Sequence, residues 1–321
     1  MSGREDHVRA FLATAGWAEA ERRHLAGDLS NRRYQRLRRA DGTTAVLMDA
    51  AADQPVGPWL RVQAWLGGIG LHPPAVLAAD EAAGLLLLED LGDDLVAQVI
   101  ARGGDEATLY RAAVDVLLRL QASPPPAFLP ELDDSTLIRL LDLFLEFLAP
   151  TAPATAADEF RAIWRAVLPA ARLGPDFFVH RDFHSLNLLW RPAATGLDRL
   201  GLIDFQDAFR GPAVYDLVSL VEDARRDVTP TVAEMVRSRY LLAHSAHDPR
   251  QFAAACAIIG AQRNLRILGV FERAARQLGR PHYREQLTPR VMAHLARNLT
   301  HPALAPVAAW LRAWAPRLPG R

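Results

Sequence analysis

The centre of the sequence reads His180-Arg181-Asp182-Phe183-His184-Ser185-Leu186-Asn187 and, beyond a short loop and an apolar run, Gly201-Leu202-Ile203-Asp204-Phe205-Gln206. An aspartate, an asparagine and a second aspartate thus follow one another in a fixed order, flanked by short apolar segments that favour strands. A carboxylate can accept a proton, and carboxylate and amide oxygens are the ligands that Mg²⁺ prefers. These two stretches therefore indicate that Asp182, Asn187 and Asp204 take part in one reaction, as a proton acceptor and as Mg²⁺ ligands.

The spacing of the three residues matches the catalytic loop and the metal-binding aspartate of kinase-type phosphoryl transfer. Asp182 is expected to accept the proton of the attacking hydroxyl, while Asn187 and Asp204 hold Mg²⁺. Each residue alone would be interpreted as a turn or cap residue, but the joint spacing favours chemistry. ATP and Mg²⁺ are the expected cofactors.

Four neighbours of this pattern are expected to shape the loop. His180 is interpreted as a core histidine, and Arg181 as a partner for a nearby carboxylate. His184 is left open between a core role and a substrate contact. Asp216, in Tyr215-Asp216-Leu217, is interpreted as a helix N-cap, as a brace that bonds the loop backbone, or as both, with no direct part in the chemistry.

Working outward, the sequence predicts strands first and helices later. Strand patterns cover residues 22–27, 34–39, 43–48, 75–79 and 85–88, with a hairpin turn at Asp41-Gly42 and a helix over 59–69. Helical periodicity follows at 96–101, 107–121, 136–148 and 158–171, and from 215 to 314. We expect an α+β, bilobal, protein-kinase-like fold. Its antiparallel-sheet lobe would span residues 1–92, with a hinge at about 89–95, and a larger, mainly helical lobe would span 93–321.

Composition excludes several classes of protein. The 321 residues carry a formal net charge of zero, whereas nucleic-acid binders usually have a basic excess. No secretory signal or apolar stretch long enough for a membrane span is present, so we expect a cytoplasmic protein with no membrane or nucleic-acid partner, and a monomer. Only six residues separate Asp204 from Gly211, which leaves no room for the long segment that holds a peptide substrate. A small-molecule acceptor is therefore expected.

The chain resembles the aminoglycoside phosphotransferase/choline kinase superfamily, and within it the anomeric N-acetylmuramate/N-acetylglucosamine kinases of cell-wall recycling. The similar segments cover most of the chain in order: residues 30–34, 45–50, 87–93, 179–184, 187–188, 203–208, 211–212, 215–220 and 262–269. The resemblance implies ATP with its adenine on the hinge backbone around Glu89 and Leu91, Asp182 as the base, and Asn187 and Asp204 as Mg²⁺ ligands. It also implies transfer to the anomeric hydroxyl of an amino sugar, giving the sugar 1-phosphate.

The candidates for the sugar pocket are His184, Gln206, Asp207, Arg263 and Arg266. Gln206 and Asp207 directly follow the metal aspartate, and the two arginines lie three residues apart, on one face of a helix. One arginine could meet a lactate carboxylate, such as that of N-acetylmuramate. The alternative for the arginines is charge on a helix surface.

One departure from the family pattern concerns the phosphates. Kinases usually place a lysine on the third strand, paired with a helix glutamate. Here all 37 basic residues are arginine, the strand ending at Met48 is apolar, and the helix over 59–69 lacks any acid. We expect Arg32 or Arg33 to replace the lysine, with the backbone N–H groups of Ser30 and Asn31. The alternative is that both arginines are solvated surface charges.

Two other functions compete with the amino-sugar kinase. The first is a kinase for another small hydroxyl acceptor: an aminoglycoside, a choline-like amine or an amino acid. An acceptor of that cationic kind would call for a pocket rich in acidic or aromatic groups. The second is a pseudokinase that binds nucleotide and serves as a scaffold. The missing lysine favours it, and the intact set of Asp182, Asn187 and Asp204 argues against it.

Overall fold

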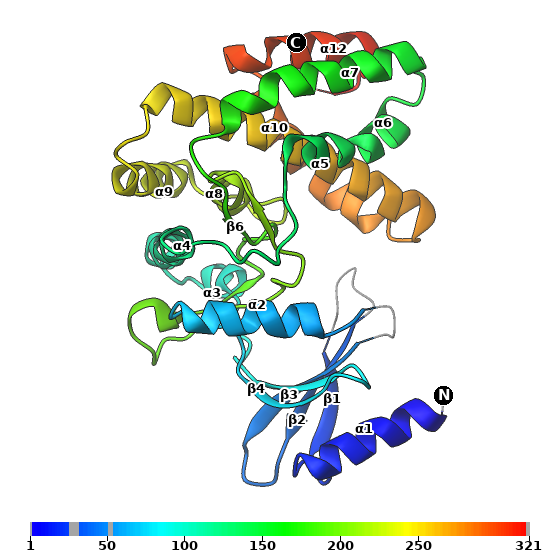
Figure 1. Ribbon diagram of the computed structural model, residues 1–321, viewed down its shortest axis with the longest axis vertical. Helices are drawn as coiled ribbons and strands as arrows, with labels where there is room; N and C mark the ends of the chain where they lie inside the picture. The colour runs from blue at the N-terminus through cyan, green and yellow to red at the C-terminus, as the bar shows by residue number, and fades with distance from the viewer. Residues whose placement is uncertain (1, 26–31, 51–53, 319–321) are drawn as a thin grey trace. The chain divides into compact units, whose positions relative to one another are not determined.

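The computed structural model describes residues 2–25, 32–50 and 54–318 of the chain. Two compact units make it up (Figure 1). The sheet unit comprises Met1–Val99 and Asn187–Gln206, and the helical unit comprises Ile100–Leu186 and Asp207–Arg321. The sheet unit thus includes a segment from far along the sequence, residues 187–206, which a single division near residue 92 assigns to the C-terminal lobe.

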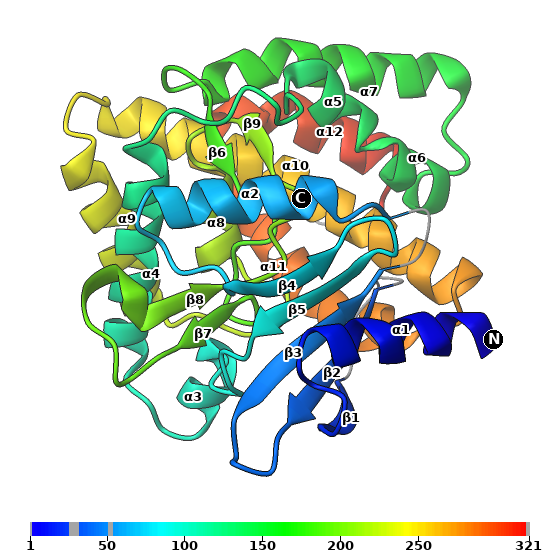
Figure 2. The same cartoon turned by 60° about the horizontal axis from the view of Figure 1, so that its bottom comes forward.

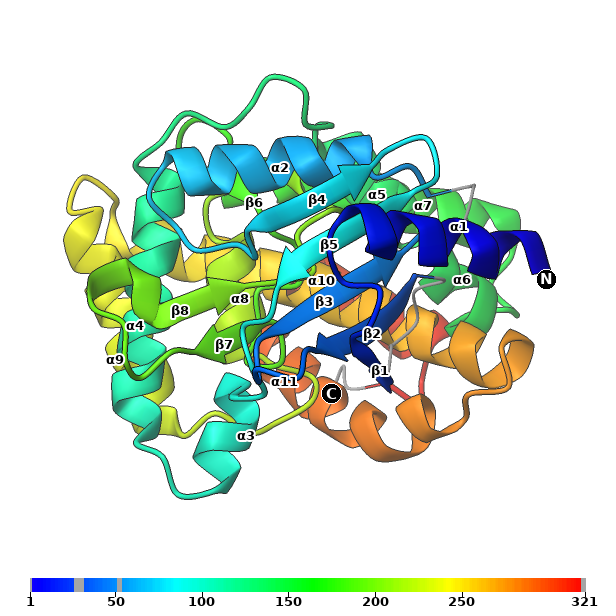
Figure 3. The same cartoon turned by 90° about the horizontal axis from the view of Figure 1, so that it is seen from below.

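A five-stranded antiparallel sheet forms the centre of the sheet unit, with strand order β1-β2-β3-β5-β4 (Figures 2 and 3). Its strands are β1 (Glu21–Leu25), β2 (Arg33–Arg38), β3 (Thr44–Asp49), β4 (Val76–Asp80) and β5 (Leu85–Glu89). The predicted turn between β2 and β3 is present: Gly42 has a φ of 86°, and the Asp41 carboxylate accepts the Thr43 N–H at 2.8 Å. The structure confirms the predicted N-terminal antiparallel sheet.

The two faces of the sheet differ because successive side chains of a strand point to opposite sides. On one face, Leu47 of β3 is buried with Val8 and Leu12 of α1 (Ser2–Thr14), which covers that face. On the other face lies Met48, fully buried, and across the β2–β3 pairing its partner is Tyr34. The second helix of the unit, α2 (Gly57–Gly68), runs beside β4 (Figures 2 and 3).

A hairpin from residues 187–206 completes the sheet unit. Its strands β7 (Leu188–Trp190) and β8 (Leu200–Leu202) pair antiparallel, with a 3₁₀ turn, η2 (Gly196–Arg199), between them. The Leu202 N–H donates to the His72 carbonyl at 2.9 Å, which ties β8 to the segment between α2 and β4. The Leu91 side chain packs directly on Gly201, where an added Cβ would lie 2.6 Å from its Cδ1 and would push it aside. This close approach fixes the hairpin against the chain that follows β5.

Helices dominate the helical unit. They are α4 (Glu106–Gln121), α5 (Asp134–Arg139), α6 (Asp142–Leu148), α7 (Ala154–Val167), α8 (Tyr215–Val221), α9 (Pro230–Ala243), α10 (Pro249–Gln277), α11 (Thr288–Asn298) and α12 (Ala305–Trp314); α3 (Val96–Ala101) crosses the unit boundary in sequence. Short helical turns lie at η1 (Leu168–Ala171), η3 (Tyr283–Leu287) and η4 (Pro302–Leu304). A two-stranded ribbon pairs β6 (Phe177–Val179) with β9 (Phe209–Gly211). Among the described residues, no helix combines the length and apolar character that a bilayer span requires.

Two predicted helices have different ends in the structure. The helix expected over 136–148 is divided into α5 and α6, because the Leu141 N–H closes a tighter turn onto the Ile138 carbonyl at 2.9 Å. The helix expected over 158–171 begins earlier, at Ala154, and gives way to η1, whose Pro169 has no N–H to continue the α-helical ladder. Phe160 anchors this region, with its ring centroid 4.4 Å from that of Trp310.

Candidate active site

The loop that follows β6 is held from beneath by one carboxylate. Asp216, in the first turn of α8, accepts the backbone N–H of His180 at 2.6 Å and that of Arg181 at 2.9 Å. Because α8 begins at Tyr215 with Val214 before it, Asp216 is not the N-cap residue that the sequence suggested as one reading. Arg181 adopts a left-handed φ of 77°, which costs energy for a residue with a Cβ. The two bonds to Asp216 stabilise this strained backbone.

Asp182 lies among positive charges in the helical unit. Burial opposes its ionisation, but the charged groups around it, Arg266 foremost, outweigh burial and hold the pKa of Asp182 at about 2. The carboxylate is therefore ionised throughout the neutral range. A base this weak is suited to accepting a hydrogen bond from a hydroxyl. It takes the proton only as the hydroxyl oxygen donates electrons to a new bond and its O–H becomes more acidic.

Asp216 shows the opposite shift. Burial raises the pKa of Asp216 to about 7, and the negative charge of Asp182 acts in the same direction, while the two backbone N–H bonds oppose the change. The carboxyl is 1% exposed, so water contributes little to its solvation. Its function in the loop is to accept hydrogen bonds.

A second acidic residue, Asp223, supports the other end of the loop and was missed from the sequence. It accepts the Ser185 hydroxyl at 2.6 Å and the Arg225 N–H at 2.8 Å, and it is fully buried. Burial works against its ionisation, yet these hydrogen bonds help keep the pKa of Asp223 below its ordinary value. The signal available in the sequence was the charged run of residues 222–227 directly after an apolar helix.

His184 is fixed as a neutral side chain by the same segment. Its Nε2 lies 2.9 Å from Nη1 of Arg225, and a guanidinium can only donate, so Nε2 accepts and carries no proton. Burial, with the Arg225 charge, lowers the pKa of His184 to about 4. His184 is thus a neutral, buried member of the loop.

In the sheet unit, the other two residues of the pattern lie together. Asn187 precedes β7 and Asp204 follows β8, so the hairpin brings the Asn187 Nδ2 to 3.4 Å from Oδ2 of Asp204. Asp204 has a left-handed φ of 64°. Gln206 donates from Nε2 to Oδ1 of Asp204 at 2.8 Å, so this candidate sugar residue contacts the predicted metal ligand.

This pair of side chains fits a magnesium ion that is completed by ligands from outside the protein. Mg²⁺ is commonly held by one or two carboxylates together with substrate phosphates and water. Among the described residues no group of three or more His, Cys, Asp or Glu side chains could hold a metal by itself. In this structure the amide nitrogen of Asn187 faces the carboxylate of Asp204, and turning the amide over would present its oxygen there. One amide oxygen and one carboxylate are hard ligands of the right kind, and few enough to leave room for phosphate oxygens.

The two candidate replacements for the missing lysine differ in orientation. Arg32 is half-buried and Arg33 is exposed. Burial raises the pKa of Tyr34 to about 12, opposed by the charge of Arg32 and reinforced by that of Asp204, so both charges lie near this phenol. Alternation along the chain puts Arg32 on the side of Tyr34 and Met48, and Arg33 on the other side. Ser30 and Asn31, the other predicted phosphate contacts, lie outside the described residues.

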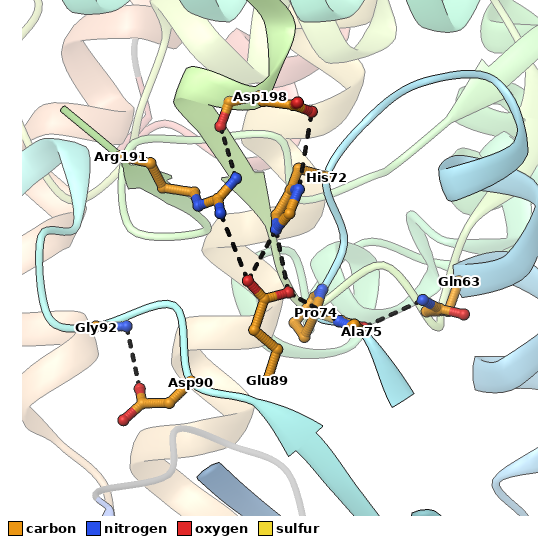
Figure 4. A network of polar contacts seen from close by, with 9 residues as sticks. All are labelled: Gln63, His72, Pro74, Ala75, Glu89, Asp90, Gly92, Arg191 and Asp198. Carbon is orange, nitrogen blue, oxygen red and sulfur yellow. Dashed lines mark hydrogen bonds and ion pairs between the residues drawn. The ribbon is translucent and has the colours of Figure 1, made fainter. Parts of the chain in front are cut away.

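The side chain of Glu89, at the end of β5, is the centre of a polar network (Figure 4). His72 Nε2 lies 3.1 Å from both carboxylate oxygens, and the Ala75 N–H donates to Oε2 at 3.1 Å. Arg191 of the hairpin lies 3.5 Å from Oε1 and donates to the Asp198 carbonyl at 2.9 Å. The Glu89 N–H donates to the Ala75 carbonyl at 2.8 Å, so this N–H is not available to a ligand.

The segment after Glu89 is clamped by an arginine from β2. Arg36 donates to Asp90 at 2.9 Å and contacts Asp93 at 2.7 Å, and Asp90 accepts the Gly92 N–H at 3.0 Å. Among the described residues no acceptor takes the N–H of Leu91. A rigid, extended segment with an available N–H is the kind of backbone that pairs with the edge of a purine.

Comparison with known proteins identifies the family. Residues 21–254 match the model of the phosphotransferase enzyme family. The chain belongs to this family. An N-acetylmuramate/N-acetylglucosamine kinase from Caulobacter vibrioides is 36% identical over 98% of both chains, and one from Neisseria meningitidis is 33% identical over 89% of this chain and 88% of its own. Among solved structures, a choline kinase from Streptococcus pneumoniae has a similar fold, with a TM-score of 0.65 and 15% identity over 91% of this chain and 99% of its own. The GDP complex of aminoglycoside 2'-phosphotransferase-IIIa is also similar, with a TM-score of 0.64 and 16% identity over 91% of this chain and 98% of its own.

Of the remaining residues predicted for the site of this phosphotransferase, three are buried and one is exposed. Arg263 and Arg266 of α10 are 3% and 9% exposed, so the alternative of surface charge is wrong for both. Asp207 is largely exposed, 4.0 Å from Nη1 of Arg181, which makes it a partner of the loop arginine. His180 is fully buried beside Phe183, at 5.8 Å between ring centroids.

Proposed function

We propose that the protein transfers the γ-phosphoryl group of ATP to the anomeric hydroxyl of N-acetylmuramate or N-acetylglucosamine, giving the sugar 1-phosphate. Relatives that carry this sugar specificity in their names match the chain over nearly its whole length. The observation that carries the chemistry is Asp182, an ionised carboxylate on a braced loop, surrounded by arginines. A second copy or another macromolecule is not required, and the monomeric, cytoplasmic protein expected from the sequence remains a prediction.

In this proposal Asp182 orients the attacking hydroxyl and receives its proton. Phosphoryl transfer proceeds through a loose transition state, in which the nucleophile needs alignment more than early deprotonation. A carboxylate with a pKa of about 2 meets that need, because it accepts a hydrogen bond at any physiological pH. The anomeric hydroxyl is also more acidic than an ordinary alcohol, so a weak base is sufficient.

Asn187 and Asp204 would hold Mg²⁺, and Gln206 would keep the Asp204 carboxylate in place. The ion, when bound, neutralises charge on the triphosphate. The Leu91 N–H and the Glu89 carbonyl would pair with adenine. Nucleotide complexes of structural neighbours, with GDP and with ADP, are consistent with a nucleotide-binding role.

Arg32 is the better candidate to replace the phosphate lysine. The charges of Arg32 and Asp204 both act on the pKa of Tyr34, so both lie near its phenol. Arg33, in contrast, is exposed and points to the other side of the strand. Arginine binds phosphate oxygens in a bidentate fork and stays charged, so the substitution is chemically competent.

The competing functions fit the charge pattern less well. An aminoglycoside or a choline-like acceptor is a cation, and the arginines around Asp182 would repel it. A scaffold that only binds nucleotide would have no use for a braced, ionised Asp182 together with converging Asn187 and Asp204.

The test is an ADP-release assay with Mg-ATP and a panel of amino sugars, aminoglycosides, choline and amino acids, followed by ³¹P spectroscopy of the product. Turnover of N-acetylmuramate or N-acetylglucosamine with a 1-phosphate signal supports the proposal, with Asp182→Asn as the inactive control. Turnover confined to a cationic acceptor, or nucleotide binding without turnover of any acceptor, would overturn it.

A further inference from the structure

Two arginines of α10, three residues apart, have different surroundings. Arg263 donates from Nη1 to the Glu222 carbonyl at the end of α8, at 3.2 Å, so it ties two helices together. The structure records no hydrogen bond and no ion pair for Arg266 within the described part of the chain, although it is only 9% exposed. Its charge nevertheless acts on Asp182.

The Arg266 guanidinium has no partner among the described residues and remains accessible to solvent. Among the described side chains, none of the buried nitrogen atoms that lack a partner belongs to Arg266, so its nitrogens still contact solvent. Because Arg266 as a residue is nine-tenths buried and has no hydrogen-bond or ion-pair partner among the described residues, its charge has lost hydration without gaining an acceptor. Such a group recovers that loss when an anion binds to it.

Of the charges that lower the pKa of Asp182, that of Arg266 acts most strongly, so an anion bound to Arg266 lies within electrostatic range of Asp182. In the proposed function, on which this inference rests, Asp182 meets the acceptor hydroxyl, so a group beside Asp182 meets the acceptor molecule. N-acetylmuramate and N-acetylglucosamine share one pyranose ring and acetamido group, and the first carries in addition an ether-linked lactate with a carboxylate. A planar guanidinium fork matches a carboxylate in bidentate fashion.

We propose that Arg266 is the specificity-determining residue that binds the acceptor carboxylate and thereby favours N-acetylmuramate over N-acetylglucosamine. Arg263 is a positioning residue, which holds α10 to the end of α8 and contributes equally to both sugars. The two arginines of one helical face therefore have separate functions.

The experiment compares Arg266→Gln with wild type on both sugars and on the carboxamide of N-acetylmuramate, which keeps the lactyl group without its charge. A lost charge-assisted pair predicts that kcat/KM for N-acetylmuramate falls ~10- to 100-fold more than that for N-acetylglucosamine. The wild-type preference for the acid over its carboxamide should disappear in the same variant. Arg266→Lys, which keeps the charge and loses the fork, should retain part of the preference.

Arg273→Gln is the matched control, because Arg273 is an exposed arginine of the same helix and should leave both sugars unaffected. An equal fall on both sugars in Arg266→Gln, no fall on either, or a change confined to the KM of ATP would each overturn the assignment. Those outcomes are distinct from failure of the proposed function, in which the wild-type protein turns over neither sugar.

Discussion

Two aspartates meet at the catalytic loop: Asp182, half-buried within it, and Asp216 of α8, fully buried beneath it. Asp182 has a pKa lowered to about 2 because neighbouring charges, that of Arg266 foremost, outweigh burial. Asp216 has a pKa raised to about 7 because burial outweighs two backbone N–H bonds. Burial acts on both in the same direction, so the difference comes from neighbouring full charges. In this loop, full charges keep a carboxylate ready for chemistry, and backbone dipoles hold one in a structural role.

The largest expected effect separates the two aspartates by activity. Asp182→Asn removes the acceptor of the hydroxyl proton, so kcat should fall by ~10³-fold, within the usual range for a general base. Its melting temperature should stay within a few degrees of wild type, since the side chain has the same shape. Steady-state kinetics and thermal melting measure both. More than a tenth of the wild-type kcat would show that Asp182 is not the base.

The second expected effect is on stability, where Asp216 should matter more than Asp182. In Asp216→Asn, one backbone N–H of the loop must face an amide NH₂ instead of an oxygen, and an unsatisfied buried donor costs ~1–3 kcal/mol. Urea unfolding should show a loss in that range, whereas Asp207→Asn, at an exposed position, should change the unfolding free energy little. If the two substitutions cost the same, Asp216 does not brace the loop.

A third comparison applies the same distinction to the arginine pair of the sheet unit. Arg32→Gln should raise the KM for ATP or lower kcat by about 10-fold, equivalent to ~1.4 kcal/mol, because a phosphate contact is lost. Arg33→Gln, on the exposed side, serves as the control and should behave as wild type. Wild-type kinetics in both variants would show that neither arginine replaces the phosphate-binding lysine.

The smallest expected effect is on the pH dependence of stability, which tests the opposite pKa shifts of Asp216 and Asp182 directly. A raised folded-state pKa means that wild type loses stability as the pH rises from about 4 toward 7, so the deficit of Asp216→Asn should narrow over that range. The slope is at most ~1.4 kcal/mol per pH unit. A lowered pKa of about 2 leaves Asp182 ionised in the folded state over the whole range, and the unfolded side chain is ionised from about pH 5 upward, so the deficit of Asp182→Asn should be flat above about pH 5. Urea titrations at several pH values check both, and parallel slopes would contradict the comparison.

The sequence predicted the features that depend on local order. The antiparallel sheet was predictable from the strand patterns and the turn at Asp41-Gly42, and the family from the spacing of Asp182, Asn187 and Asp204. The expected bonds from Asp216 to the loop backbone are present, whereas its reading as an N-cap is wrong, because α8 starts at Tyr215 and its N-cap residue is Val214.

What the sequence could not show depends on long-range packing. Asp223 reaches Ser185 across 38 positions, and no local pattern links the two. Arg32 and Arg33 could not be told apart until the pairing of Tyr34 with Met48 fixed which way each points. Likewise, the burial of Arg263 and Arg266 depends on how α10 packs, because helical periodicity alone does not identify the neighbours of a polar face.

The left-handed backbone at Arg181 and Asp204 has a consequence for how related chains lose function. Glycine and asparagine adopt this conformation with the least strain, so drift toward either residue would relax the main chain while deleting a charge. Under the proposed function, a homologue with asparagine or glycine at the position of Asp204 would keep the architecture and fold at least as easily, but would lose a Mg²⁺ ligand. Backbone conformation and the proposed chemistry therefore favour different residues at Asp204.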